Sequence, residues 1–276
     1  MIAVVTFSAV TNTTTRPAGI RTVELGELKV SYVPDGVVQL PGLSWLRATT
    51  ETFWAGLPGY LDEGGNLVAS IGGLLVEHGD RALLIDAGVG PVFLPAEPGN
   101  AHGAIRGGAL LDNLAELGRS PEEIEAVALT HLHLDHTGWL LHHPRPFRGA
   151  EVLVAAPEWA ADGNPELAAQ VRTISDGEEI FPGVRAALAP GHTPGHTAYV
   201  LSSSGRRLIA FGDALHSPVQ IAHPELSAAS DHDPAEAVAS RRRLIGELTA
   251  PDVLGFGIHF ADVQFGRVVE GTWFPA

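Results

Sequence analysis

Residues 130–138 read THLHLDHTG and place three histidines and one aspartate within six consecutive positions. In an extended backbone alternate side chains share a face, so we expect His131, His133 and Asp135 to converge on one side. His136 is expected to begin the turn away. Neutral imidazoles and carboxylates suit Zn²⁺, and the same set accepts Fe or Mn. A string of this form arises by chance in such a chain only about 2 times in a thousand, so the stretch predicts a metal site.

The composition restricts the class of partner. The chain has 276 residues and a formal charge of −15, and such a charge repels phosphate backbones and anionic lipid surfaces. Because the chain contains no cysteine, any metal must be held by imidazole and carboxylate groups. No apolar run approaches about 18 residues, and the opening stretch lacks the basic region of a secretory signal. We therefore expect a small-molecule substrate, no nucleic acid, no membrane and a cytoplasmic location.

Short apolar runs bounded by glycine, proline and serine predict a chain rich in β-strands, with helices in both halves. Residues 28–33 and 37–40 are expected to pair as a hairpin through Pro34-Asp35-Gly36. Helices are expected over residues 110–117, before Gly118, and from the N-cap residue Asp233 onward. Further strands are expected at residues 67–76, 82–85, 126–130, 152–155, 184–188, 199–201 and 208–211.

Two segments depart from this pattern. Residues 1–20 are expected to form an irregular N-terminal extension. Residues 41–65 lack the alternation of apolar and polar residues that predicts a strand, but they contain Trp45, Phe53, Trp54 and Tyr60. Such aromatic residues either pack within a loop or form a lip that faces the substrate of an active site.

Four motifs resemble those of the metallo-β-lactamase-fold hydrolases. THLHLDHTG is followed, in the order typical of that family, by PGHTPGHT at residues 190–197, GDALH at residues 212–216 and GIHF at residues 257–260. Residues 72–88 are similar to the family's early strands, so the resemblance covers most of the chain. It implies an α/β fold, a four-layered αββα sandwich of two mixed β-sheets flanked by helices, forming a single domain over residues 1–276.

The resemblance also implies a dinuclear metal centre. By this resemblance, one divalent ion would be bound by His131, His133 and His192. The second would be bound by Asp135, His136 and His259, and Asp213 would bridge the two ions. All seven positions are filled, which indicates two ions, Zn²⁺ first, with Fe or Mn as alternatives. A metal-bridging hydroxide would then attack an ester-like bond, with Asp135 as the catalytic residue that orients the water.

Other residues are interpreted by their position near these motifs. Asp86 and His196 are expected to hydrogen-bond the ligands rather than bind metal. The candidates for the substrate pocket are Trp45, Phe53, Trp54, His216 and His223. The run Arg241–Arg243 is interpreted as a solvated helix face or part of a dimer interface, with an anion site as the alternative.

Metal ligands alone do not identify the substrate, because this fold serves several reactions. The motifs after residue 212 are most similar to the lactonase and organophosphate-hydrolase-like branch. The aromatic residues between 45 and 60 favour a neutral, partly apolar molecule, so a lactone or carboxylic ester is the leading hypothesis. The alternatives are a thioesterase of the glyoxalase II type, a phosphotriesterase, a single-iron dioxygenase of the same fold and a non-catalytic binding module. A homodimer is a further hypothesis.

Overall fold

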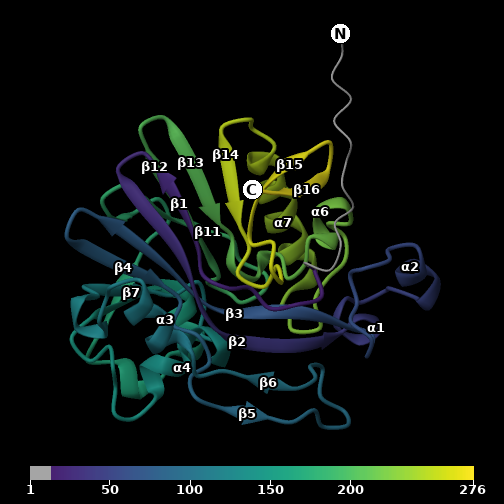
Figure 1. Ribbon diagram of the computed structural model, residues 1–276, viewed down its shortest axis with the longest axis horizontal. Coiled ribbons are helices and arrows are strands. Elements are labelled where there is room, and N and C mark those ends of the chain that lie inside the picture. Colours follow the sequence, from purple (N-terminus) through teal and green to yellow (C-terminus); the bar gives the residue numbers. More distant parts are fainter. Residues whose placement is uncertain (1–13) are drawn as a thin grey trace.

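The computed structural model describes residues 14–276 as two β-sheets packed face to face, with helices outside them (Figure 1). Of the extension predicted for residues 1–20, residues 1–13 lie outside the described residues. Residues 14–20 contain no helix or strand.

The first sheet comes from the N-terminal part of the chain. Within residues 14–276 it has nine strands, in the order β5-β6-β2-β3-β4-β7-β8-β9, with β1 paired to β2. Strands β4, β7, β8 and β9 pair in parallel, whereas β2, β3 and β4 pair antiparallel, so the sheet is mixed. Its strands are β1 (Arg21–Leu25), β2 (Leu28–Pro41), β3 (Asn66–His78), β4 (Arg81–Ile85), β5 (Phe93–Leu94), β6 (Ile105–Arg106), β7 (Ala126–Ala128), β8 (Glu151–Ala155) and β9 (Val171–Ile174).

The second sheet has seven strands in the described part of the chain and follows sequence order from β10 to β16. Only the β13–β14 pair is parallel among these described strands. Its strands are β10 (Glu179–Phe181), β11 (Val184–Leu188), β12 (Thr197–Ser203), β13 (Arg206–Ala210), β14 (Val253–Phe256), β15 (Phe265–Val269) and β16 (Thr272–Pro275).

The helices are short except for the last. They are α1 (Gly42–Trp45), α2 (Glu51–Ala55), α3 (Leu110–Glu116), α4 (Leu134–Leu141), α5 (Ala156–Asp162), α6 (Val219–Ala222) and α7 (Pro234–Leu248), with 3₁₀ turns η1 (Pro121–Glu123), η2 (Pro165–Leu167) and η3 (Gly212–Ala214). As predicted, α7 begins after Asp233, whose side chain accepts the N–H groups of Ala235 and Glu236. Within residues 14–276, no helix has the length and apolar character needed to cross a membrane.

Three clusters of buried apolar side chains hold the layers together. Between the sheets, Tyr32 of β2 packs against Phe256 of β14 with ring centroids 5.8 Å apart. Leu114 of α3 is buried against the outer face of the first sheet, and Leu244 of α7 against that of the second. Burial of each such side chain stabilises the fold by about 1.5–3 kcal/mol. The order helix, sheet, sheet, helix confirms the predicted fold class.

The hairpin predicted for residues 28–40 is wrong, because β2 is one continuous strand. It pairs with β3 from Leu28 opposite His78 to Pro41 opposite Asn66, with a register shift between Pro34 and Gly36. The turn-type residues therefore form a β-bulge. A Cβ at Gly36 would lie 1.8 Å from the carbonyl oxygen of Arg106 in β6, so glycine permits the close approach of that strand.

At this bulge the buried Asp35 carboxylate points toward neighbouring loops and accepts hydrogen bonds from them. Its side chain is 2% exposed. Its oxygens accept five donors at 2.7–3.0 Å, namely the backbone N–H groups of Val89, Gly90, Gly108 and Leu110 and the indole N–H of Trp139. One side chain thus ties the loop after β4 to the start of α3 and to α4.

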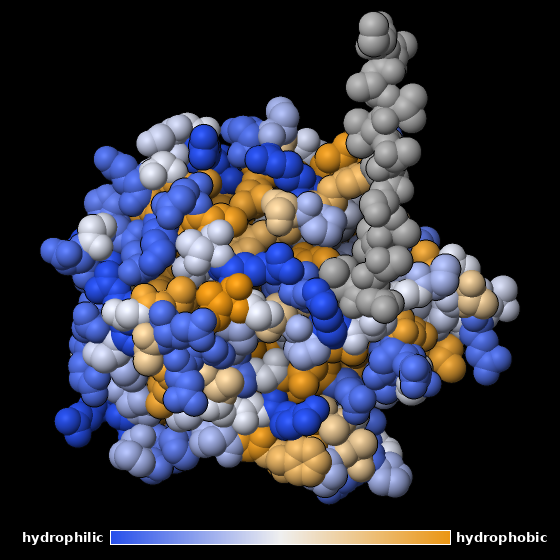
Figure 2. Space-filling model, in the orientation of Figure 1, coloured by the Kyte–Doolittle hydropathy of each residue, from blue (hydrophilic) through white to orange (hydrophobic). Residues whose placement is uncertain are grey.

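Apolar residues gather in small groups on the face drawn in Figure 2, one of them at its lower edge over β5 and β6. In this hairpin Phe93 is 65% exposed and Leu94 39% exposed. The hairpin therefore offers an apolar surface at the edge of the first sheet.

We expect Asp35→Ala to lower the free energy of unfolding by about 3 kcal/mol or more, because it leaves five buried donors without an acceptor. The measurement is urea denaturation followed by circular dichroism. Asp112→Ala is the control, since Asp112 is exposed on α3, and it should cost no more than about 0.5 kcal/mol. Equal stability of the two variants would contradict the role assigned to Asp35.

Candidate metal centre

Strands of both sheets end at one edge, and the loops that follow them carry the predicted ligands. β4 and β7 pair in parallel, so Asp86 and His131, which follow these strands, emerge side by side. β13 and β14 also pair in parallel, which places Asp213 beside His259. His192 comes from the loop between β11 and β12. The topology therefore brings distant parts of the sequence to one place.

The THLHLDHTG stretch is half loop and half helix. Extended backbone was predicted as far as Asp135, but α4 starts at Leu134, with His133 as its N-cap. The carbonyl of His133 accepts the N–H of His136 at 3.1 Å and the hydroxyl of Thr137 at 3.0 Å. Asp135 lies in the first turn, where the helix dipole favours a carboxylate. The prediction of extended backbone was therefore wrong for Asp135, although the helix still directs it to the same site.

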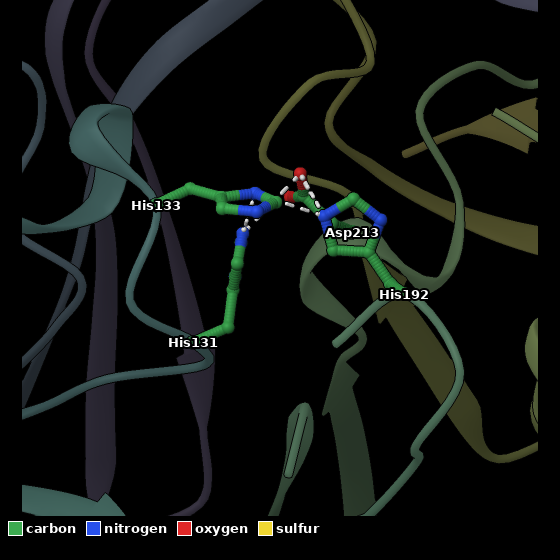
Figure 3. A group of neighbouring side chains, drawn as sticks. All are labelled: His131, His133, His192 and Asp213. Atoms are coloured by element: carbon green, nitrogen blue, oxygen red, sulfur yellow. Dashed lines mark hydrogen bonds and ion pairs between the residues drawn. The ribbon is translucent and has the colours of Figure 1, made fainter. Parts of the chain in front are cut away.

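The predicted ligands form two groups. Within each group, one ligand atom per residue lies within 4.8 Å of the others. Figure 3 shows the first group, with His131 and His133 on one side facing His192 and Asp213. The first group consists of His131, His133, His192 and Asp213, and the second of Asp135, His136 and His259.

Asp213 lies between the groups, and each of its carboxylate oxygens faces one of them. Oδ2 lies 3.8 Å from His131 Nε2 and 3.4 Å from His192 Nε2. Oδ1 lies 3.3 Å from His136 Nε2 and 3.1 Å from His259 Nε2. A carboxylate in this position can bridge two cations roughly 3.5–4 Å apart.

The polar atoms of the site do not satisfy one another's hydrogen bonds, but their arrangement suits a bound cation. Among the described residues, His136 Nε2 and Asp213 Oδ1 are buried without a hydrogen-bond partner, a costly arrangement in a protein interior. His133 Nδ1 lies 2.8 Å from His131 Nε2 and 3.2 Å from His192 Nε2. Converging imidazole nitrogens and carboxylate oxygens are the donor set of Zn²⁺.

The electrostatics agree with this donor set. Burial, together with the neighbouring imidazoles, holds the pKa of His131 well below its usual value, which favours the neutral form that binds metal. Burial acts to raise the pKa of Asp213, but the surrounding histidines outweigh it and hold that pKa well below its usual value. Burial acts to lower the pKa of His136, but three neighbouring carboxylates, Asp213 first, raise it well above its usual value. The site gathers negative charge that a cation would neutralise.

A comparison with protein families agrees with this geometry. The family model described as "Metallo-beta-lactamase superfamily" matches residues 74–257, well over half of the chain. The chain belongs to the metallo-β-lactamase superfamily.

Several members of the superfamily are similar to it. AidC, a dizinc quorum-quenching lactonase solved with a product bound, is 23% identical, with a TM-score of 0.78 over 94% of this chain and 98% of AidC. A probable metal-dependent hydrolase from Staphylococcus aureus is 19% identical, with a TM-score of 0.80 over 92% of this chain and 99% of its own. An N-acyl homoserine lactonase from a Bacillus species is 26% identical over 147 residues, which is 47% of this chain and 57% of the lactonase. The chain thus spans little more than half the length of that curated relative.

In this superfamily member Asp86 contacts the candidate ligand His136 on the side of the ring away from Asp213. Its carboxylate accepts the Thr130 N–H at 2.8 Å and the Thr130 hydroxyl at 2.9 Å, and it contacts His136 Nδ1 at 2.9 Å. Its backbone φ of 61° lies in the left-handed region, which is strained for a residue other than glycine. These contacts agree with the expectation that Asp86 hydrogen-bonds a ligand.

His196 uses both ring nitrogens in hydrogen bonds. Nδ1–H donates to the Ala189 carbonyl at 3.1 Å, and Nε2 accepts the backbone N–H of Asp213 at 3.0 Å. Burial, together with the nearby His192, lowers the pKa of His196 to about 3, so the ring is neutral. His196 therefore fixes the backbone of Asp213 and has no lone pair left for a metal.

A cavity of about 290 Å³ opens onto the candidate ligands. The residues exposing polar groups to it are His102, His133, Asp135, Asp213, His216, Ser230 and His259. Most of the remaining wall is apolar and consists of Val38, Leu40, Trp45, Val89, Leu94, Ala101, Leu134 and Ile105. The cavity is thus lined by polar residues of the candidate metal centre together with a larger number of apolar residues.

Two of the five predicted pocket residues line this cavity, namely Trp45 and His216. Their rings meet edge to face at 5.3 Å. Phe53, Trp54 and His223 are not among the lining residues. Phe53 instead packs against Trp54 at 5.2 Å and against His223 at 5.1 Å. From the predicted lip at residues 41–65, Trp45 alone lines this cavity.

The interpretation of the arginine run as a solvated face is wrong for Arg241. Arg242 and Arg243 are exposed, but Arg241 is 0% exposed and lies behind the first ligand group. It contacts Asp231, a buried residue that in turn contacts His192. No sequence motif marks Asp231, and the same holds for Glu158, whose carboxylate accepts the N–H groups of Leu132 and Gly195.

We expect Zn²⁺ to raise the melting temperature of the protein relative to chelator-treated protein, because ligands from separate loops are held together only in the folded state. At a free concentration 100 times its Kd, one ion adds about 2.7 kcal/mol, a rise of roughly 5–10 °C for a chain of this size. Differential scanning calorimetry measures the shift. His131→Ala should reduce it, and equal melting of the native protein with zinc and with chelator would contradict the assignment.

Proposed function

We propose that the protein is a metal-dependent hydrolase that holds two divalent cations, most readily Zn²⁺, and cleaves a lactone or carboxylic ester. The observation that supports this most is the position of Asp213, whose two oxygens face two separate ligand groups on the floor of one cavity. Each group would hold one cation, and Asp213 would contribute an oxygen to each of them.

Two such cations, when bound, polarise the substrate carbonyl and lower the pKa of water so that hydroxide is available near neutral pH. The chain's own residues then have to orient the substrate and manage the proton. Among the residues that line the described cavity there is neither serine at a nucleophile elbow nor any lysine or arginine. This lining agrees with an uncharged substrate and with water as the nucleophile.

Asp135 is placed to handle the proton. It is the most accessible member of the second group, with a side chain 24% exposed, compared with 0% for His136 and 2% for His259. It lines the cavity, and Oδ2 lies 3.6 Å from His259 Nε2. In the proposed reaction water adds to the carbonyl carbon as one of its protons passes to Asp135. The acyl C–O bond then breaks, and Asp135 returns that proton to the departing alcohol oxygen, which leaves a carboxylic acid and an alcohol.

His216 is placed to orient the substrate. The residue is 2% exposed, neither ring nitrogen makes a hydrogen bond within the described residues, and Nε2 lies 3.1 Å from Asp213 Oδ2. Its backbone N–H is held at 2.7 Å by Gln220 Oε1, and its ring stacks on His259 at 5.6 Å. An imidazole carries at least one N–H in either charge state, and in the proposed function His216 donates it to a substrate oxygen bound next to Asp213.

The cavity walls favour the ester class over the alternatives. Apolar side chains form much of the cavity wall, and such a surface accommodates an acyl chain next to a reactive carbonyl. AidC, whose fold is shared, was solved with the product of a lactone. A thioester or a phosphotriester remains an outcome that the substrate panel below distinguishes.

The test is a hydrolysis panel with a lactone, an aryl ester, a thioester and a phosphotriester, each with and without chelator. We expect the lactone or ester to be the best substrate and chelator to abolish its turnover. His131→Ala and Asp213→Ala should lower the metal content of the protein and should reduce its turnover by several orders of magnitude. His143→Ala is the control, since that side chain is 69% exposed, and it should leave both unchanged. Full activity and two metals in Asp213→Ala would overturn the proposed bridge.

We expect His216→Phe to keep its metal content but to lose about 10²–10³-fold in kcat, the usual cost of removing one preorganised donor. Steady-state kinetics and elemental analysis measure the two quantities. His223→Phe is the matched control, because His223 packs on Phe53 outside the cavity lining. Unchanged kinetics in His216→Phe would exclude the contact with substrate.

A further inference from the structure

Arg241 of α7 is a fully buried cation at the back of the metal centre. It is 0% exposed. Its Nε donates to the Ala214 carbonyl at 2.7 Å, and Nη1 donates to the carbonyls of Pro224 at 2.9 Å and Leu226 at 2.8 Å. Nη2 reaches Asp231 Oδ2 at 3.4 Å. One side chain thus gathers the loop that begins directly after Asp213.

Asp231 connects this arginine to the first ligand group. Its Oδ1 lies 3.0 Å from His192 Nδ1, and its Oδ2 accepts the Ala228 N–H at 2.9 Å. A carboxylate at this distance takes a hydrogen bond from Nδ1–H. The tautomer of His192 is then fixed, and the lone pair of Nε2 points toward His133 Nδ1 at 3.2 Å and Asp213 Oδ2 at 3.4 Å.

The second ligand group is held by different elements. His259 Nδ1 contacts the Ser70 carbonyl of β3 at 2.8 Å, and His136 Nδ1 contacts Asp86 at 2.9 Å. Neither contact involves α7 or Asp231. A change at Asp231 should therefore act on one group and spare the other, whereas a change at Arg241 also frees the Ala214 carbonyl next to Asp213.

We propose that Arg241 and Asp231 are positioning residues that set the orientation and tautomer of His192, and hence the metal affinity of the group formed by His131, His133 and His192. This proposal rests on the proposed function, because it assumes that the two groups bind cations. A carboxylate that accepts the free N–H of a metal-bound imidazole raises its basicity. Arg241 keeps that carboxylate in place by binding it and the loop on either side of it.

The structure distinguishes this role from a charged patch on α7. Lysine at position 241 has a single ammonium group and cannot reach the four acceptors that the planar guanidinium contacts. Arg242 is the next residue of the same helix and is exposed. Arg242→Lys therefore controls for the substitution itself.

The experiment measures metal binding in the full chain. Asp231→Asn, Arg241→Lys, Arg242→Lys and the native protein are titrated with Zn²⁺ against a chromophoric chelator, and ¹¹³Cd-loaded samples report on each site by NMR. We expect Asp231→Asn to bind one of two equivalents about 10- to 100-fold more weakly. Arg241→Lys should weaken at least that same equivalent, because it releases Asp231. The ¹¹³Cd resonance that weakens should be the one lost in His192→Ala. Arg242→Lys should match the native protein.

Each other outcome has a distinct meaning. In Asp231→Asn, equal loss of both equivalents would show a general structural effect and overturn the proposal, as would native affinity at both sites. Circular dichroism confirms that each variant is folded, and Asp231→Asn, the near-isosteric change, tests the proposal if Arg241→Lys does not fold. A native protein that binds no zinc would instead overturn the proposed function, and this inference with it.

Discussion

The rest of the centre depends on the carboxylate of Asp213 and on its place between two sets of imidazoles. Its oxygens lie 3.1–3.8 Å from five histidine nitrogens, three beside Oδ2 and two beside Oδ1. Such a buried carboxylate is stable only where positive charge or hydrogen-bond donors compensate its lost hydration. Its backbone is fixed from both sides, because His196 accepts its N–H and Arg241 binds the carbonyl of the next residue, Ala214.

Buried carboxylates, rather than regular secondary structure, hold the loops around this point. Asp35 fixes the loop after β4, Asp86 fixes the start of the ligand stretch, and Asp231 fixes His192. Each accepts several N–H groups, so its charge is compensated locally. The two sheets supply the rigid edge, since the parallel pairs β4–β7 and β13–β14 deliver their following loops to the same place. Precise ligand geometry therefore comes from polar contacts built on an apolar sandwich.

The sequence predicted which polar residues gather at this site better than it predicted their surroundings. The motifs at residues 130–138 and 212–216 can be recognised from the spacing of residues close together in the sequence. The seven predicted residues meet at one site. The prediction of a hairpin turn at Pro34-Asp35-Gly36 was wrong because the same residue types occur in turns and in β-bulges. Only the pairing of β2 with β3 decides between the two. Phe53 and Trp54 were predicted to line the substrate pocket, but in the structure their rings pack on each other. Aromatic side chains pack on one another as readily as on a ligand, so the sequence does not distinguish the two roles. Asp231 and Arg241 could not be found, because their pairing depends on the path of a loop that has no sequence signature.

Anomalous X-ray diffraction from zinc-loaded crystals, measured at the zinc edge, tests the central claim most directly. We expect two peaks, roughly 3.5–4 Å apart, one within bonding distance of each oxygen of Asp213. One peak should lie among His131, His133 and His192, and the other among Asp135, His136 and His259. A single peak, or peaks that leave Asp213 uncoordinated, would contradict the bridging role of this carboxylate.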